Sequence, residues 1–137
     1  MAQTIVVIGA SRGIGLELAR IWHERGERVL AVCRRASEEL AGLGVQVIEG
    51  IDVSAEDDVR RLRDRLGDTT IDMLYHSAGI MRDENLRDMN PDTIREQLDV
   101  NAVAPLRVVH ALMDRLGSGS KVGLMTSRMG SIADNDS

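Results

Sequence analysis

The chain opens with the stretch TIVVIGASRGIGLELARIW (residues 4–22), in which three glycines separate an apolar run from a helical pattern. Residues 5–8 have the length and β-branched character of a buried strand. Gly9, Gly13 and Gly15 follow with the spacing G-x-x-x-G-x-G. Because glycine loses more conformational entropy on folding than alanine does, three glycines here indicate a turn that needs a backbone free of side chains.

Short β-branched runs alternate with longer segments of helical period along the rest of the chain. Five runs have strand length, and the first two are apolar on both faces, as in a covered parallel sheet: residues 5–8, 29–32, 45–48, 71–75 and 121–125. Repeated strand-helix alternation is typical of right-handed crossovers. We therefore predict an α/β fold, a Rossmann-type doubly wound parallel sheet of five strands, in a single domain over residues 1–137.

The expected helices carry start signals and buried stripes. Ser54 is expected as an N-cap, with Asp57 placed to close a capping box. The first helix has four apolar residues at helical spacing on the face expected to meet the sheet: Ile14, Leu18, Ile21 and Trp22.

The longest helical stretch is expected over residues 91–116, with Asn90 as its cap and Pro91 in the first turn. Pro105 should bend or interrupt it. Several apolar residues spread over more than one face: Val103, Leu106, Val109, Leu112, Met113 and Leu116. Because exposed apolar patches drive association, we expect a homo-oligomer formed through this helix.

Composition excludes several classes of function. The net charge is −5, and Trp22 and Tyr75 are the only aromatic residues, which disfavours a nucleic-acid partner. Cys33 is the single cysteine and the three histidines are scattered, so neither a disulfide nor a metal site is expected. No basic leader or run of 18 apolar residues is present, which predicts no membrane partner and a cytoplasmic location.

The glycine turn fits an anion at a helix N-terminus. A bare backbone there lets a pyrophosphate approach the free N–H groups of the helix. The spacing is neither G-x-G-x-x-G nor the Walker pattern. The alternative is that the three glycines serve only a tight strand-to-helix turn.

Four further motifs follow in the order found in the short-chain dehydrogenase/reductase family, which the chain resembles, most closely in its carbonyl-reductase-like members. They are Asp52-Val53, YHSAGI at 75–80, DVNAVAPL at 99–106 and LMTSRMGS at 124–131. The resemblance covers the N-terminal part of the family, whose later strands and helices are missing here. It implies an oxidoreductase that transfers hydride between a nicotinamide and a small carbonyl or alcohol substrate.

The resemblance also implies roles for particular residues. Ser127 would orient the substrate oxygen, and Asn101 would hold a water in the catalytic site. Plainer alternatives remain, because Ser127 could be a loop serine and Asn101 a helix-interrupting residue, and Asp52 could cap the helix that follows it. The cofactor-binding residues implied are Gly9, Ser11, Arg12, Gly13, Ile14, Gly15, Cys33, Arg34, Asp52, Val53, Ser77, Ala78 and Gly79.

The end of the second strand favours NADP(H) over NAD(H). NAD-preferring folds place an acidic side chain there for the ribose hydroxyls, whereas this chain has Cys33-Arg34-Arg35, with Arg12 in the glycine turn. Guanidinium groups suit a 2′-phosphate through charge-assisted hydrogen bonds. The alternative is that these arginines are solvated surface charges.

The family's proton-transfer pair, Tyr-x-x-x-Lys, does not occur in these 137 residues, whose only tyrosine and lysine are Tyr75 and Lys121. General acid catalysis contributes about 10² to 10⁴-fold, so we expect this chain by itself to be inactive. Two alternatives stay open: a non-catalytic NADP(H)-binding or regulatory module, and an interaction protein that kept the fold without the cofactor.

Overall fold

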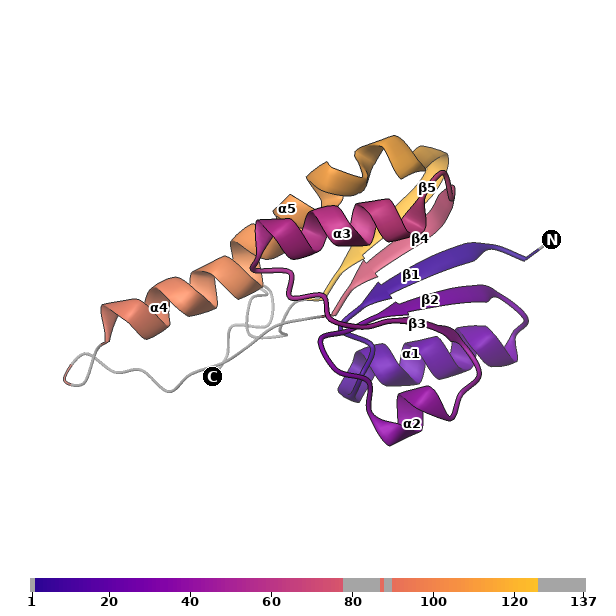
Figure 1. Ribbon diagram of the computed structural model, residues 1–137, viewed down its shortest axis with the longest axis horizontal. Coiled ribbons are helices and arrows are strands. Elements are labelled where there is room, and N and C mark those ends of the chain that lie inside the picture. The colour runs from indigo at the N-terminus through magenta and orange to yellow at the C-terminus, as the bar shows by residue number, and fades with distance from the viewer. Residues whose placement is uncertain (1, 78–86, 88–89, 126–137) are drawn as a thin grey trace, which may run out of the picture.

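A five-stranded parallel sheet forms the centre of the computed structural model, which describes residues 2–77, 87 and 90–125 (Figure 1). From one edge to the other the strands are β3 (Gln46–Ile48), β2 (Arg28–Val32), β1 (Thr4–Ile8), β4 (Ile71–His76) and β5 (Leu116–Leu124). Every pairing is parallel. The predicted doubly wound α/β fold is confirmed.

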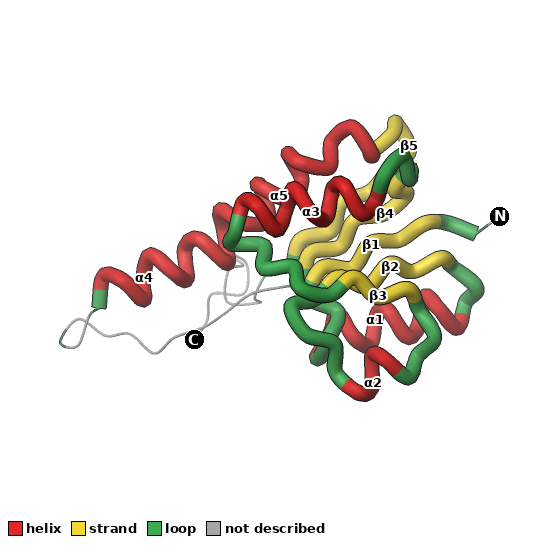
Figure 2. Tube along the Cα trace, viewed as in Figure 1, coloured by secondary structure: helices red, strands yellow, loops and turns green. Residues whose placement is uncertain are grey.

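Helices cover both faces of the sheet (Figures 1 and 2). They are α1 (Gly13–Glu24), α2 (Glu38–Ala41), α3 (Glu56–Leu66), α4 (Pro91–Leu98) and α5 (Ala104–Leu112). α1 and α2 lie on one face, α3 and α5 lie on the other, and α4 extends beyond the sheet. The sheet is therefore the middle layer of three.

The core lies on both sides of β1, because this central strand is apolar at every position from Ile5 to Ile8. These four residues are at most 1% exposed. Val6 and Ile8 belong to the cluster under α3 and α5, and Ile5 and Val7 to the cluster under α1 and α2. Burial on both faces explains why the strand shows no polar alternation.

α1 meets the sheet through different residues from those predicted. Its buried residues are Gly15, Leu16 and Ala19. Ile14 is 57% exposed and Leu18 and Ile21 are half-buried, so this part of the prediction was wrong. Trp22 does pack against the core. The small residues let the helix lie close to β1, and that contact turns Ile14 outward.

The helix start predicted at Ser54 was also wrong. Ala55 occupies the cap position of α3, without a side-chain hydrogen bond. The Oδ1 of Asp52 accepts both the N–H and the hydroxyl of Ser54, at 3.0 and 2.6 Å, which holds Ser54 in the preceding loop. Asn90 caps α4 as predicted, and its Oδ1 accepts the Asp92 N–H at 2.9 Å.

The long helical stretch is interrupted, as Pro105 predicted. A π-helical segment, η1 (Asp99–Val103), separates α4 from α5, and the Ala104 N–H donates to the Asp99 carbonyl five residues back. The wider turn fits a proline that cannot donate a backbone hydrogen bond.

The predicted end of this helix, at residue 116, was wrong. α5 ends at Leu112, a 3-10 turn η2 (Met113–Arg115) follows, and Leu116 begins β5. Leu112 is fully buried under the sheet, whereas Val103, Leu106 and Met113 are exposed. Fewer apolar residues are therefore exposed than the sequence suggested, because α5 buries part of its apolar face against the sheet.

The glycine turn brings the start of α1 onto the end of β1. Gly9 and Gly13 have φ of 83° and 60°, in the left-handed region that side chains avoid. A Cβ on Gly15 would lie 2.2 Å from the Gly9 carbonyl oxygen. These backbone positions cannot accept a side chain without movement of the turn.

We expect Gly15→Ala to lower the free energy of unfolding by about 2 kcal/mol, because the new methyl must push α1 off β1. Urea denaturation measures this. Gly119→Ala is the matched control: a Cβ there meets nothing within 4 Å, so a change within about 0.5 kcal/mol is expected. Equal free energies of unfolding for the two variants would contradict the interpretation that a Cβ at position 15 has no room beside the Gly9 carbonyl.

Candidate functional site

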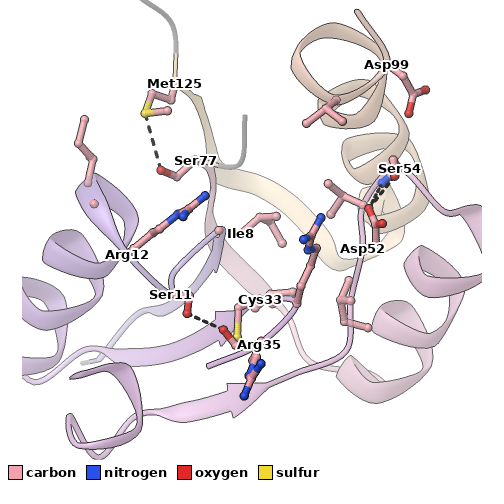
Figure 3. Close-up of a pocket in the computed structure, with 18 of the residues that line it drawn as sticks. Ile8, Ser11, Arg12, Cys33, Arg35, Asp52, Ser54, Ser77, Asp99 and Met125 are labelled. Atoms are coloured by element: carbon pink, nitrogen blue, oxygen red, sulfur yellow. Dashed lines mark hydrogen bonds between the residues drawn. The ribbon is translucent and has the colours of Figure 1, made fainter. Parts of the chain in front are cut away.

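A pocket of about 750 Å³ lies at the carboxyl edge of the sheet (Figure 3). The strand order reverses between β1 and β4, and ligands of open α/β sheets bind at such a switch point. Its lining includes most of the predicted binding residues: Gly9, Ser11, Arg12, Gly13, Ile14, Cys33, Arg34, Asp52, Val53 and Ser77. Figure 3 shows Arg12 on one side of it and Asp52 and Ser54 on the other.

The N-terminus of α1 lines one side of the pocket (Figure 3). Arg12 at its cap position makes no side-chain cap hydrogen bond, and no acidic residue lies in the first turn. α2 and α4 are capped by Ser37 and Asn90, whereas α3, like α1, has no side-chain cap. No side chain among the described residues caps the first N–H groups of α1, and with the positive end of the helix dipole these groups form a site for an anion beside the pocket.

Ser11 ties the glycine turn to the arginine-bearing turn after β2. Its hydroxyl donates to the Arg35 carbonyl at 2.6 Å (dashed in Figure 3) and accepts the Ser37 N–H at 2.8 Å. The Ser37 hydroxyl in turn donates to the Ser11 carbonyl at 2.5 Å. The Ser11 side chain therefore positions two turns against each other rather than standing free in the pocket.

Arginines line the pocket from two turns, Arg12 from the glycine turn and Arg34 and Arg35 from the turn after β2. Arg12, Arg34 and Arg35 are exposed pocket-lining residues, and within the described part of the chain none of them forms an ion pair. Cys33 stands where an acidic residue would select NAD. Burial, together with the charge of Glu49, raises the pKa of the Cys33 thiol, so this position carries no negative charge at neutral pH.

The loop that follows β3 also lines the pocket, and it lies beside the end of β2, because the Ile51 N–H donates to the Cys33 carbonyl at 3.2 Å. The Asp52 N–H donates to Asp58 Oδ2 at 2.9 Å, and a hydrogen bond from Arg61 holds the pKa of the Asp58 carboxyl below its usual value. Asp52 Oδ1 accepts from Ser54. Among the described residues, Asp52 Oδ2 and the Val53 N–H have no partner. A neighbouring acceptor and donor can recognise a ligand edge that presents a donor beside an acceptor.

The remaining predicted site residues are placed differently. Gly15 does not line the pocket, and its role is the close contact with Gly9. Asn101 is exposed on η1 and is not a lining residue. The Ser77 N–H donates to the Ile8 carbonyl at 2.8 Å. Three predicted residues lie outside the described residues: Ala78, Gly79 and Ser127.

One wall was missed by the sequence reasoning. Glu96, Asp99 and Val100 line the pocket from α4 and η1, and Met125 lines it from the end of β5. The spacing 96, 99, 100 places three residues on one helical face, so the pattern was available, but it does not reveal which face the pocket uses.

The single tyrosine serves the core. The Tyr75 ring packs edge-on against Trp22, with centroids 6.2 Å apart at 67°. A Cβ on Gly123 of β5 would lie 2.8 Å from the Tyr75 ring, so that glycine makes room for it. Tyr75 does not line the pocket.

Within residues 2–77, 87 and 90–125, no group of three or more His, Cys, Asp or Glu side chains is arranged to hold a metal ion. No helix among the same residues is long and apolar enough to cross a membrane.

The open parallel sheet with a pocket at its switch point defines a Rossmann-type protein. The sequence model of the family described as short chain dehydrogenase matches residues 3–133. The chain therefore belongs to the short-chain dehydrogenase family.

Individual relatives agree with this assignment. A 1-hydroxy-2-glutathionyl-2-methyl-3-butene dehydrogenase from Rhodococcus sp. (strain AD45) is 38% identical over 98% of this chain and 61% of that protein. A carbonyl reductase from Pseudomonas aeruginosa PAO1 in complex with NADP is 34% identical, with a TM-score of 0.89 over 97% of this chain and 62% of that one. A structure described as a short-chain dehydrogenase/reductase from Burkholderia multivorans with bound NADP has a TM-score of 0.91 at 29% identity, over 100% of this chain and 64% of that one.

The chain spans less than two thirds of the length of each of these three relatives. In each case, the match covers nearly all of this chain. The shared part contains the glycine turn and all five strands of the sheet described above.

His76, beside the pocket, predicts a pH dependence of stability. It is 2% exposed and its Nε2 has no hydrogen-bond partner in the described part of the chain. Burial lowers the pKa of His76 from 6.5 to about 4, opposed in part by a hydrogen bond to its own backbone. The unfolded chain therefore binds more protons between those values, so stability falls as the pH falls from about 6.5 to about 4.

Between pH 6.5 and pH 4.5, we expect the free energy of unfolding of His76→Asn to fall by about 2 kcal/mol less than that of the unmodified chain. Urea denaturation at both pH values measures this. His110→Asn is the control, because His110 is exposed and its replacement should leave the pH dependence as in the unmodified chain. If His76→Asn loses as much stability as the unmodified chain over this range, buried neutral His76 is not the cause.

Proposed function

We propose that this chain is the NADP(H)-binding part of a short-chain oxidoreductase that acts in the cytoplasm on small carbonyl or alcohol compounds. One observation carries the proposal: the N-terminus of α1, which no described side chain caps, opens into a pocket lined by Arg12 and Arg34, with no carboxylate at position 33. A pyrophosphate and a 2′-phosphate are both anions, and these groups match them. The NADP-bound relatives from Pseudomonas and Burkholderia support the same choice.

The residues that line the pocket suggest how the cofactor would be held. Gly9 and Gly13 leave bare backbone for the pyrophosphate at the start of α1. Asp52 Oδ2 could accept from the adenine amino group, and the Val53 N–H could donate to the adjacent ring nitrogen. Arg34 would bind the 2′-phosphate. When bound, the nicotinamide supplies or accepts the hydride, and the protein's part is to fix its orientation.

Catalysis is proposed to need residues beyond these 137. By family resemblance, Ser127 would orient the substrate oxygen and Asn101 would hold a water near the proton-transfer pair. Tyr75 is packed against Trp22, and Lys121 is an exposed residue of β5, so neither supplies that pair. We therefore propose that residues 1–137 form one dinucleotide-binding domain that binds cofactor without turnover.

We expect Arg34→Ala to weaken NADPH binding by about tenfold and to leave NADH binding within about twofold, because only NADPH carries the phosphate that a guanidinium would bind. Titration of the 137-residue chain by calorimetry or nicotinamide fluorescence measures both. Arg60→Ala is the control, since Arg60 is an exposed residue on α3 outside the pocket. NADPH affinity unchanged by Arg34→Ala, or NADH bound as tightly as NADPH, would contradict the assignment.

We also propose that the exposed apolar residues along α4 to η2 form a homo-oligomer contact. Leu98, Val103, Leu106 and Met113 are between 47% and 66% exposed, and exposed apolar side chains along one helical segment favour association. This set omits Leu112, which the core buries.

Leu106→Glu should shift the sedimentation of the chain at micromolar concentration toward the monomer, because it places a charge in the centre of the apolar face. Ala41→Glu adds the same charge to α2, on the other side of the sheet, and should leave the distribution unchanged. An unmodified chain that sediments only as a monomer at this concentration overturns the contact.

A further inference from the structure

Arg107 of α5 does not line the pocket, yet its guanidinium joins two segments that do. Nη1 donates to the Val53 carbonyl at 3.0 Å, and Nη2 donates to Asp99 Oδ1 at 3.2 Å. The Arg107 side chain is 21% exposed and that of Asp99 is 36% exposed. Partial burial reduces solvent screening, so this link is stronger than a fully exposed ion pair.

On the loop side, Arg107 adds one hydrogen bond to a stretch of backbone that already forms several others. The Ile51 N–H donates to the Cys33 carbonyl at 3.2 Å, and the Ala55 N–H donates to the Asp52 carbonyl at 3.0 Å. The N–H groups of Asp52 and Ser54 are bound by carboxylates. Val53 alone in this run keeps its N–H open among the described residues, while Arg107 holds its carbonyl from the far side of the wall.

On the helical side, Arg107 spans the π-helical turn. Asp99 is the first residue of η1, and its carbonyl accepts the Ala104 N–H that closes the wide turn. Its carboxylate holds Arg107 eight residues later. The same segment carries Asn101. One side chain therefore connects the loop with the open Val53 N–H to the segment that contains Asn101.

We propose that Arg107 is a positioning residue that couples occupation of the Val53 side of the pocket to the ordering of residues 99–103. The proposal rests on the NADP(H)-binding function proposed above, of which it uses only the adenosine end. Two acceptors in different directions need the forked guanidinium, because a lysine ammonium at the same position could reach only one of them well. A ligand that immobilises Val53 should therefore also slow the motions of η1.

The binding test uses adenosine 2′,5′-bisphosphate and the 137-residue chain, by calorimetry. We expect Arg107→Met to bind it about tenfold more weakly, because the loop must then be ordered on binding, and Arg107→Lys to fall between. Arg63→Met is the matched control: Arg63 forms a cross-element ion pair with Asp114 at 2.8 Å, and neither lines the pocket. Its affinity should stay within about twofold of the unmodified chain.

Amide hydrogen exchange tests the coupling separately. In the unmodified chain, saturating bisphosphate should slow exchange at both 13–16 and 99–103. Saturated Arg107→Met should keep the first effect and lose the second. If Arg107→Met is too unstable to titrate, Arg107→Lys provides the test, with partial loss expected at 99–103.

Two outcomes separate the hypotheses. Unchanged affinity and unchanged protection of 99–103 in the Arg107 variants would overturn the positioning role and leave the cofactor proposal standing. Failure of the unmodified chain to bind the bisphosphate at millimolar concentration would overturn the cofactor proposal itself, and the coupling with it.

Discussion

The contact between Gly15 and the Gly9 carbonyl is the constraint on which the rest of the site depends. A Cβ would lie 2.2 Å from that oxygen, so α1 can begin where it does only because the side chain is absent. This close start brings the N-terminus of α1, which no described side chain caps, to the carboxyl edge of β1, at the point where the strand order reverses.

Around that fixed point, side chains hold the backbone of the pocket. The hydroxyl groups of Ser11 and Ser37 join the glycine turn to the turn after β2 through hydrogen bonds to the backbone. Asp52 and Asp58 bind the backbone of the loop that follows β3. These bonds hold the arginine-bearing turns and an open donor-acceptor pair in place before any ligand arrives, which lowers the ordering cost of binding.

Sequence patterns predicted the parts of the fold that depend on local chemistry. The strand at β1 follows from four consecutive apolar residues, and the Asn90 cap and the interruption at Pro105 follow from one or two residues each. The errors arose where distant packing decides the outcome. Ile14 turned outward because α1 rests on Gly15, and Leu112 was buried because α5 packs on the sheet. Ser54 does not cap α3, because its N–H and hydroxyl both donate to Asp52.

We propose that the α1 N-terminus and the loop at Val53 together form one dinucleotide site. An amide NMR titration of the 137-residue chain with NADP⁺ tests it most directly, because each backbone N–H reports separately. We expect the largest shifts at Gly13, Ile14 and Val53, with little change in β5 before Leu124. Shifts confined to the β5 edge or the exposed face of α5, or none at saturating NADP⁺, would contradict it.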